Sequence, residues 1–139
     1  MRQASGILRV ETQGQGLVEI SDEVLAWVEA QEMHEGLLTL FCRHTSASLL
    51  IQENAAREVR ADLQDFFAHL APEDPARYRH DDEGPDDMPA HLRTALTSVQ
   101  LSIPLADRRL MLGTWQGIYL FEHRTRPHRR EVALHLMGE

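Results

Sequence analysis

The side chains best suited to metal or acid–base chemistry gather between Tyr78 and His91, in the segment YRHDDEGPDDMPAH. Five acidic residues separate His80 from His91, and one glycine with two prolines excludes a regular helix or strand there. Imidazole and carboxylate groups are the usual protein ligands of divalent cations. The segment therefore indicates a metal site, although it matches no established spacing such as HExxH. An acidic run by itself is more typical of a solvated surface loop.

His44 is the second candidate ligand, because it ends an apolar run and opens the hydroxyl-rich stretch HTSAS. Strand ends are where a sheet presents side chains to a cleft, but a hydrogen-bonded core histidine is an equally good interpretation. The other histidines carry weaker signals. We expect a solvated turn around His123 and His128, and structural or surface roles for His34, His69 and His135. Ser46 and Ser48 lack the GxSxG context of a nucleophile, and one sequence cannot establish a Ser–His–acid arrangement.

The composition predicts one globular domain, residues 1–139, with 42% hydrophobic residues and enough length for a core without disulfides. The apolar runs are too short to cross a bilayer, and the N-terminal segment has no secretory signal. The single cysteine, Cys42, lies in an apolar run and is expected to be a small buried residue in a cytoplasmic protein. A net charge of −8 argues against nucleic acid as the main partner.

Hydrophobic periodicity predicts the elements that must position these residues. Strands are expected at 5–11, 17–20, 37–42, 49–51, 101–105, 110–112, 117–122 and 131–137. Helices are expected from 21 to before Gly36, from 54 to 70, and from about 88 onward. Because strands and helices do not alternate in regular βαβ units, the pattern predicts an α+β fold with a largely antiparallel sheet.

Helix-start signals place the candidate ligands more closely. Ser21, Asn54 and Asp87 are each expected to be the N-cap of the helix that follows. His91 then lies in the first turn of the third helix, where the helix dipole disfavours a protonated imidazole. A ring nitrogen would therefore be available to a cation or a proton.

Six motifs together resemble the YjbQ family. They are HTSAS (44–48), EN (53–54), YxHDDEGPDDMPAH (78–91), GTWQGIYL (113–120), EHR (122–124) and the terminal GE (138–139). They occur in order, at compatible spacing, without departure inside any motif, and they cover the chain from about residue 5 to its end. Coincidence of several long motifs makes this resemblance specific.

The resemblance implies a sandwich-like α+β domain that assembles as a homotrimer. It also implies secondary thiamine-phosphate synthase activity, a weak coupling of a pyrimidine pyrophosphate to a thiazole phosphate. The presumed site, carried over by position, contains His44, Thr45, Ser46, Glu53, Asn54, His80, Glu83, Asp87, His91, Trp115, Gln116 and Glu122. This set includes the candidates chosen above from the residues alone.

These observations lead to a metal-assisted enzyme acting on a phosphorylated small molecule. We expect His44, His80 and His91 to bind a divalent cation, zinc in preference to magnesium because the set is rich in nitrogen. Catalytic or ligand-orienting roles are expected for Glu83, Asp87 and Glu122. Substrate-binding roles are expected for Thr45, Ser46, Glu53, Asn54, Trp115, Gln116 and Arg129.

Two alternatives stay open. Departure of pyrophosphate usually requires magnesium bound to carboxylates, whereas the expected ligand set is rich in histidine. This mismatch indicates that the native reaction differs from thiamine-phosphate synthesis. The chain is then a hydrolase of a phosphorylated metabolite, or a non-catalytic trimer that binds a metal or small molecule. Arg124, Arg129 and Arg130 are available to a phosphate, although a solvated turn also explains them.

Overall fold

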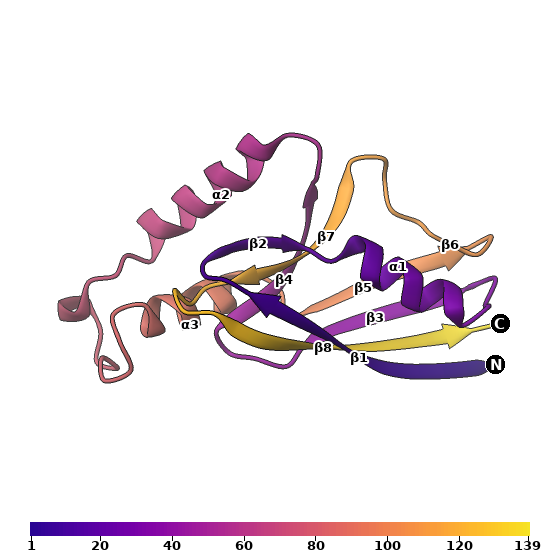
Figure 1. Ribbon diagram of the computed structural model, residues 1–139, viewed down its shortest axis with the longest axis horizontal. Coiled ribbons are helices and arrows are strands. Elements are labelled where there is room, and N and C mark those ends of the chain that lie inside the picture. Colours follow the sequence, from indigo (N-terminus) through magenta and orange to yellow (C-terminus); the bar gives the residue numbers. More distant parts are fainter.

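The protein, described by a computed structural model over residues 1–139, contains two β-sheets and three α-helices (Figure 1). The larger sheet contains, in spatial order, β1 (Arg2–Thr12), β8 (His128–Gly138), β3 (Gly36–Cys42), β5 (Gln100–Ala106) and β6 (Arg109–Leu110). The smaller sheet contains β2 (Gly16–Glu19), β7 (Gln116–Glu122) and β4 (Ala47–Glu53). Every strand pair is antiparallel, which confirms the predicted α+β class.

The core lies on one face of the larger sheet. Side chains alternate along a strand, so every second residue, such as Leu38 and Leu134, points inward and is buried. Helix α1 (Ser21–Ala30) covers this face with Val24 and Val28, which are also buried. Burial of Cys42 agrees with the sequence prediction.

The end of the sheets that carries the candidate site is fixed by the register of β4 and β7. Ala47 pairs with Glu122, so the segment before β4 and the turn after β7 emerge side by side. Helix α3 (Asp87–Leu96) packs at this end, where Leu49 N donates to Ser98 O at 2.6 Å just after the helix. The two chain termini lie together at the opposite end (Figure 1).

Helix α2 (Arg57–Leu70) stands away from the sheets (Figure 1) and is followed by a short 3-10 helix, Pro75–Arg77. The apolar side chains of this helix are only partly covered. Phe67 packs edge-on against Phe121 with the ring centroids 5.6 Å apart, whereas Phe66 is 58% exposed.

The three predicted N-caps are wrong, because tertiary partners take the side chains. Ser21 is the first residue of α1, and its Oγ donates to Glu19 and accepts from Ile118 N. Asn54 precedes α2 by three positions. Asp87 is the first residue of α3 rather than its cap, and its carboxylate points into the candidate site instead.

Candidate metal centre

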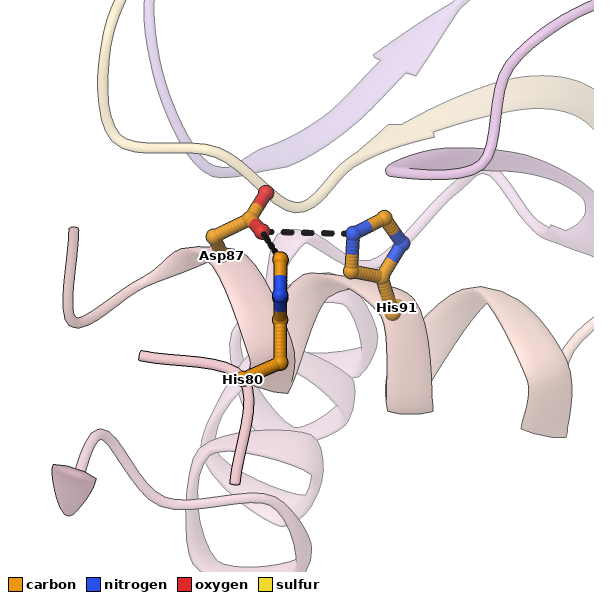
Figure 2. A group of neighbouring side chains, drawn as sticks. All are labelled: His80, Asp87 and His91. Carbon is orange, nitrogen blue, oxygen red and sulfur yellow. Dashed lines mark hydrogen bonds and ion pairs between the residues drawn. The ribbon is translucent and has the colours of Figure 1, made fainter. Parts of the chain in front are cut away.

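Two histidines and one aspartate converge at the N-terminal end of α3 (Figure 2). Asp87 Oδ2 lies 2.8 Å from His80 Nε2 and 3.3 Å from His91 Nε2. The ligand atoms of the three residues all lie within 4.8 Å of one another. One carboxylate oxygen thus faces two imidazole nitrogens, which is the arrangement expected around a small cation.

Helix α3 positions Asp87 and His91, and the acidic loop positions His80. Asp87 and His91 are four residues apart on α3, so they lie on the same helix face. His80 comes from the loop, which turns back at Gly84 with a φ of 98°. That backbone conformation favours glycine over residues with a Cβ atom.

Arg124 holds the loop in this shape. Its Nε donates to Asp86 Oδ2 at 2.8 Å, its Nη1 donates to Asp87 Oδ1 at 2.7 Å, and its Nη2 donates to Glu83 O at 3.0 Å. Burial opposes ionisation of Asp86, but the bonds from Arg124 and Thr125 N prevail and lower its pKa to about 2. Both buried acids therefore stay ionised, and Asp87 directs its Oδ2 toward His80 and His91.

The hydrogen-bond partners fix which nitrogen of His91 faces Asp87. Its Nδ1 lies 2.9 Å from Thr45 O, a carbonyl that only accepts, so Nδ1 carries the proton. Nε2 faces Asp87 Oδ2 at 3.3 Å, the position from which it would bind a cation. A backbone carbonyl in this role is typical of metal-bound histidines.

His80 is held by carboxylates on both sides of the same nitrogen. Its Nε2 lies 2.8 Å from Asp87 Oδ2 and 2.9 Å from Glu83 Oε2. These two hydrogen bonds, from Asp87 first and then Glu83, raise the pKa of His80. The ring therefore carries a proton at the position that a cation would take.

The donor set fits a divalent cation that prefers nitrogen and oxygen ligands. Two imidazole nitrogens and one carboxylate oxygen leave a coordination position open, as in catalytic zinc sites. Magnesium fits less well, because it prefers an octahedral set of oxygens. Glu83 is exposed beside the group and is the nearest additional carboxylate.

His44 is not part of this group within one chain. Its Nε2 accepts the backbone N–H of Glu131 at 2.7 Å. Burial, followed by the charge of Arg130, lowers the pKa of His44, so its ring is neutral. The structure therefore brings together His80 and His91, and places Asp87 where His44 was expected.

Glu122, expected to move protons, is instead fully buried in an ion pair with Arg130. Thr12 Oγ1 donates to its Oε1 at 2.6 Å, and Arg130 Nε donates to the same oxygen at 2.8 Å. Burial would raise the pKa of Glu122, but these partners lower it. Ser46 joins this network, since its Oγ accepts from Arg130 Nη2 at 3.0 Å. The network supports the fold beneath the site.

Four predicted substrate-binding residues lie at the other end of the smaller sheet, where Glu53 pairs with Gln116. Six residue steps along the strand, from Ala47 to Glu53, separate them from the Ala47–Glu122 pair, about 20 Å at about 3.3 Å per step. Their contacts are local: Asn54 N donates to Trp115 O at 2.9 Å, and Gly113 N donates to Gln116 Oε1 at 2.7 Å. One chain does not bring them to the metal centre.

Two other expectations for the arginines and histidines near the end of the chain are corrected. Arg129 is exposed and pairs with Glu11 at 2.7 Å, away from the site. His123 is fully buried rather than solvated, with Nε2 2.9 Å from Ser48 Oγ and with no partner for Nδ1. No local signal marks His123 as buried, because its ring packs against Phe121 and Ser48. The sequence also did not predict that Arg124 holds the acidic loop, because its partners Asp86 and Asp87 are distant from it along the chain.

We expect His123 to stay neutral well below the ordinary pKa of histidine. Burial, then the charge of Arg93, lowers its pKa to about 3. His123 binds a proton near pH 6.5 in the unfolded chain but not in the folded chain. Its contribution to the free energy of unfolding is therefore fully present above that pH. Stability then falls by up to about 1.4 kcal/mol per pH unit between about pH 6.5 and 3. Nitrogen chemical shifts of His123 across this range, with the urea-unfolded chain as reference, test the claim. Protonation of folded His123 near pH 6 would contradict it.

No helix in the structure has the length and apolar content needed to cross a membrane.

Comparisons with known proteins extend over nearly all of the chain. A family model described as UPF0047 protein YjbQ-like matches residues 7–139. The chain is 54% identical over 138 residues to UPF0047 protein sll1880 of Synechocystis sp., covering 99% of this chain and 94% of that protein. It is 38% identical over 133 residues to UPF0047 protein YjbQ of Escherichia coli O157:H7, covering 95% and 96% respectively. The solved structure of the conserved hypothetical protein TT1486 from Thermus thermophilus matches with a TM-score of 0.84 at 38% identity, covering 95% of this chain and 99% of that chain.

Proposed function

The chain belongs to the UPF0047 YjbQ-like family, and we propose from that premise that it binds one divalent cation through His80, Asp87 and His91. Zinc is the preferred ion for two imidazoles and one carboxylate. The observation that supports this most directly is Asp87 Oδ2, which faces both Nε2 atoms at 2.8 and 3.3 Å. Asp87 replaces His44 in the ligand set expected from the sequence.

The proposed activity is metal-assisted chemistry on a phosphorylated small molecule, with the thiamine-phosphate synthase reaction as a side activity. A bound divalent cation supplies a Lewis acid for a phosphoryl oxygen. Within this chain, Arg124 and Thr45 orient the ligands, and Glu83 is the exposed carboxylate within reach to accept a proton. Glu122 has no such role in the proposal, because it is buried against Arg130.

A non-catalytic binding protein is the second candidate, and the arginines favour it. Arg124, Arg129 and Arg130 each pair with a carboxylate, so none of the three is free for a pyrophosphate. Turnover separates the two candidates. Hydrolysis or transfer above trace level by the zinc-loaded chain, across a panel of phosphorylated metabolites, supports the enzyme; traces alone support the binding protein.

Zinc binding is expected to displace a proton from His80. Because Asp87 and Glu83 raise the pKa of His80, zinc affinity should rise with pH until that raised pKa has been passed. Calorimetry in two buffers of different ionisation enthalpy measures the protons released per zinc, and elemental analysis gives the stoichiometry. We expect about one zinc per chain and a weaker pH dependence in Glu83→Gln. Zinc binding without proton release below pH 7 would contradict the role of His80.

We also propose that copies of the chain associate as a homotrimer through the outer face of the larger sheet. Paired positions on β1, β8, β3 and β5 form three rows on this face that contain no Asp, Glu, Lys or Arg, in a chain of net charge −8. The rows are Ile7, Ala133, Phe41 and Gln100; Ser5, His135, Thr39 and Ser102; and Gln3, Met137, Leu37 and Pro104. Like charges do not oppose association there, and four of these apolar side chains are substantially exposed: Ile7, Leu37, Phe41 and Met137.

Light scattering after gel filtration tests this assembly. The unmodified chain is expected at three times the monomer mass, and the substitution Leu37→Asp should yield monomers, because it places a like charge in each interface. Phe66→Asp, on the exposed face of α2, is the matched control and should leave the mass unchanged. Dissociation by Phe66→Asp alone would assign the interface to α2 instead.

A further inference from the structure

A cavity of about 740 Å³ adjoins the candidate metal centre and shares His91 and Thr45 with it. Its lining comes from the end of β3 with the segment after it, and from α3 with the segment leading into β5, which meets β3 where Cys42 N donates to Val99 O at 2.7 Å. Its volume is within the range of sites for small organic ligands. The lining residues are Phe41, Cys42, Arg43, His44, Thr45, His91, Thr94, Ala95, Thr97 and Val99.

The polar side chains of this cavity are one arginine, two histidines and three threonines, and no carboxylate lines it. His44 accepts the N–H of Glu131 with Nε2, so its neutral ring carries the proton on Nδ1. Thr94 is 8% exposed, and its Oγ1 has no hydrogen-bond partner. A buried hydroxyl without a partner is costly, which indicates that a ligand or water completes it. The acids of the loop from Asp81 to Asp87 are absent from this lining.

The remaining lining is apolar. Phe41 is 48% exposed in the single chain and belongs to the face proposed above as the trimer interface, so the cavity lies at the edge of that interface. Val99 lies beside the end of β3, where Cys42 N donates to its carbonyl at 2.7 Å, and Ala95 comes from α3. An exposed aromatic ring beside small side chains suits a flat apolar body. The cavity thus combines donors, an apolar wall and, through His91, access to the cation proposed above.

We propose that this cavity binds the organic body of a small oxyanion, whose charged group reaches the cation while an apolar ring lies against Phe41 and Ala95. An acceptor on that body meets His44 Nδ1–H or Thr94 Oγ1. The inference depends on the proposed function for the cation alone. Phosphate esters and carboxylates share this oxyanion chemistry, so both are tested.

Calorimetry on the full zinc-loaded chain tests the proposal with phenyl phosphate, benzoate and inorganic phosphate as probes. We expect phenyl phosphate to bind at least about tenfold more tightly than inorganic phosphate, because the ring is removed from water. Affinities of benzoate and phenyl phosphate then show which oxyanion is preferred. Equal affinity for phenyl and inorganic phosphate would overturn the proposal.

The substitution Ala95→Trp places a large side chain at the cavity and should abolish the tenfold advantage while zinc binding is retained. Ala68→Trp, at an exposed position of α2, is the matched control. It should change neither the advantage of phenyl phosphate over inorganic phosphate nor zinc binding. An advantage that survives Ala95→Trp overturns the cavity assignment. A failure of the zinc-binding proposal can be distinguished from a failure of the cavity proposal, because zinc stoichiometry is measured independently. If no zinc binds, the metal-free chain must still prefer phenyl phosphate to inorganic phosphate, or the cavity assignment fails too.

Discussion

Replacement of Asp87 by asparagine is expected to reduce zinc affinity by more than about 100-fold, since loss of an outer partner alone costs about 10- to 100-fold. The substitution removes the charge of the one side chain that faces both His80 and His91. It also removes the ion pair between Asp87 Oδ1 and Arg124, so the loop loses part of its clamp. Competition with a chromophoric chelator measures the affinity.

The control for Asp87→Asn is Asp81→Asn, which makes the same charge change in the same loop at an exposed position. We expect it to leave zinc binding almost unchanged. Because Asp87 is buried, Asp87→Asn also requires a stability measurement. His91→Ala, at a partly exposed position, provides a second test with less structural cost. Undiminished stoichiometric zinc in both Asp87→Asn and His91→Ala would refute the proposed ligand set.

The second large effect concerns the buried pair of Arg130 and Glu122. The substitution Arg130→Met is expected to lower the free energy of unfolding by about 3–5 kcal/mol, because it leaves the Glu122 carboxylate buried without its cation. Thr12 and two backbone N–H groups continue to donate to that carboxylate and do not replace the lost charge. Urea unfolding followed by circular dichroism gives the value.

The neighbouring arginine is a close control. Arg129 pairs with Glu11 on the exposed side of the same strand, so Arg129→Met should change stability little. The double substitution Arg130→Met with Glu122→Leu should recover much of the loss, since neither charge is then buried alone. Equal effects of Arg129→Met and Arg130→Met would show that the buried pair has no special role.

Local sequence determined much of the architecture. Apolar runs predicted β3 and β7; β7 is buried on both faces, whereas β3 and β8 bury alternate residues. Proline and glycine fixed the end of α2 and the turn of the acidic loop, since both act through the backbone of their own segment. The motif around His80 and His91 was likewise legible in one stretch of chain, and the structure brings these two side chains together.

Tertiary packing decided which other residues join them. Asp87 belongs to the metal centre and His44 does not. The reason is that each side chain is oriented by its hydrogen-bond partner, and the fold determines which partner is nearby. Arg124, the partner of Asp87, is 37 residues away in sequence, and Glu131, the partner of His44, is 87 residues away. Periodicity reports the face of an element on which a residue lies, but not the segment that will cover it.

The same distinction explains the misplaced roles near the end of the chain. Glu122 was expected to move protons from the end of a strand, and His123 to lie in a solvated turn, yet both are fully buried. Arg130 pairs with Glu122, and Ser48 lies 2.9 Å from the ring of His123, contacts between distant residues that only the folded chain makes. The sequence by itself therefore determined the strands, the helices and the acidic loop with its two histidines. Only the tertiary structure decided which charges are neutralised in the interior and which remain available to a cation, because that choice depends on long-range pairs.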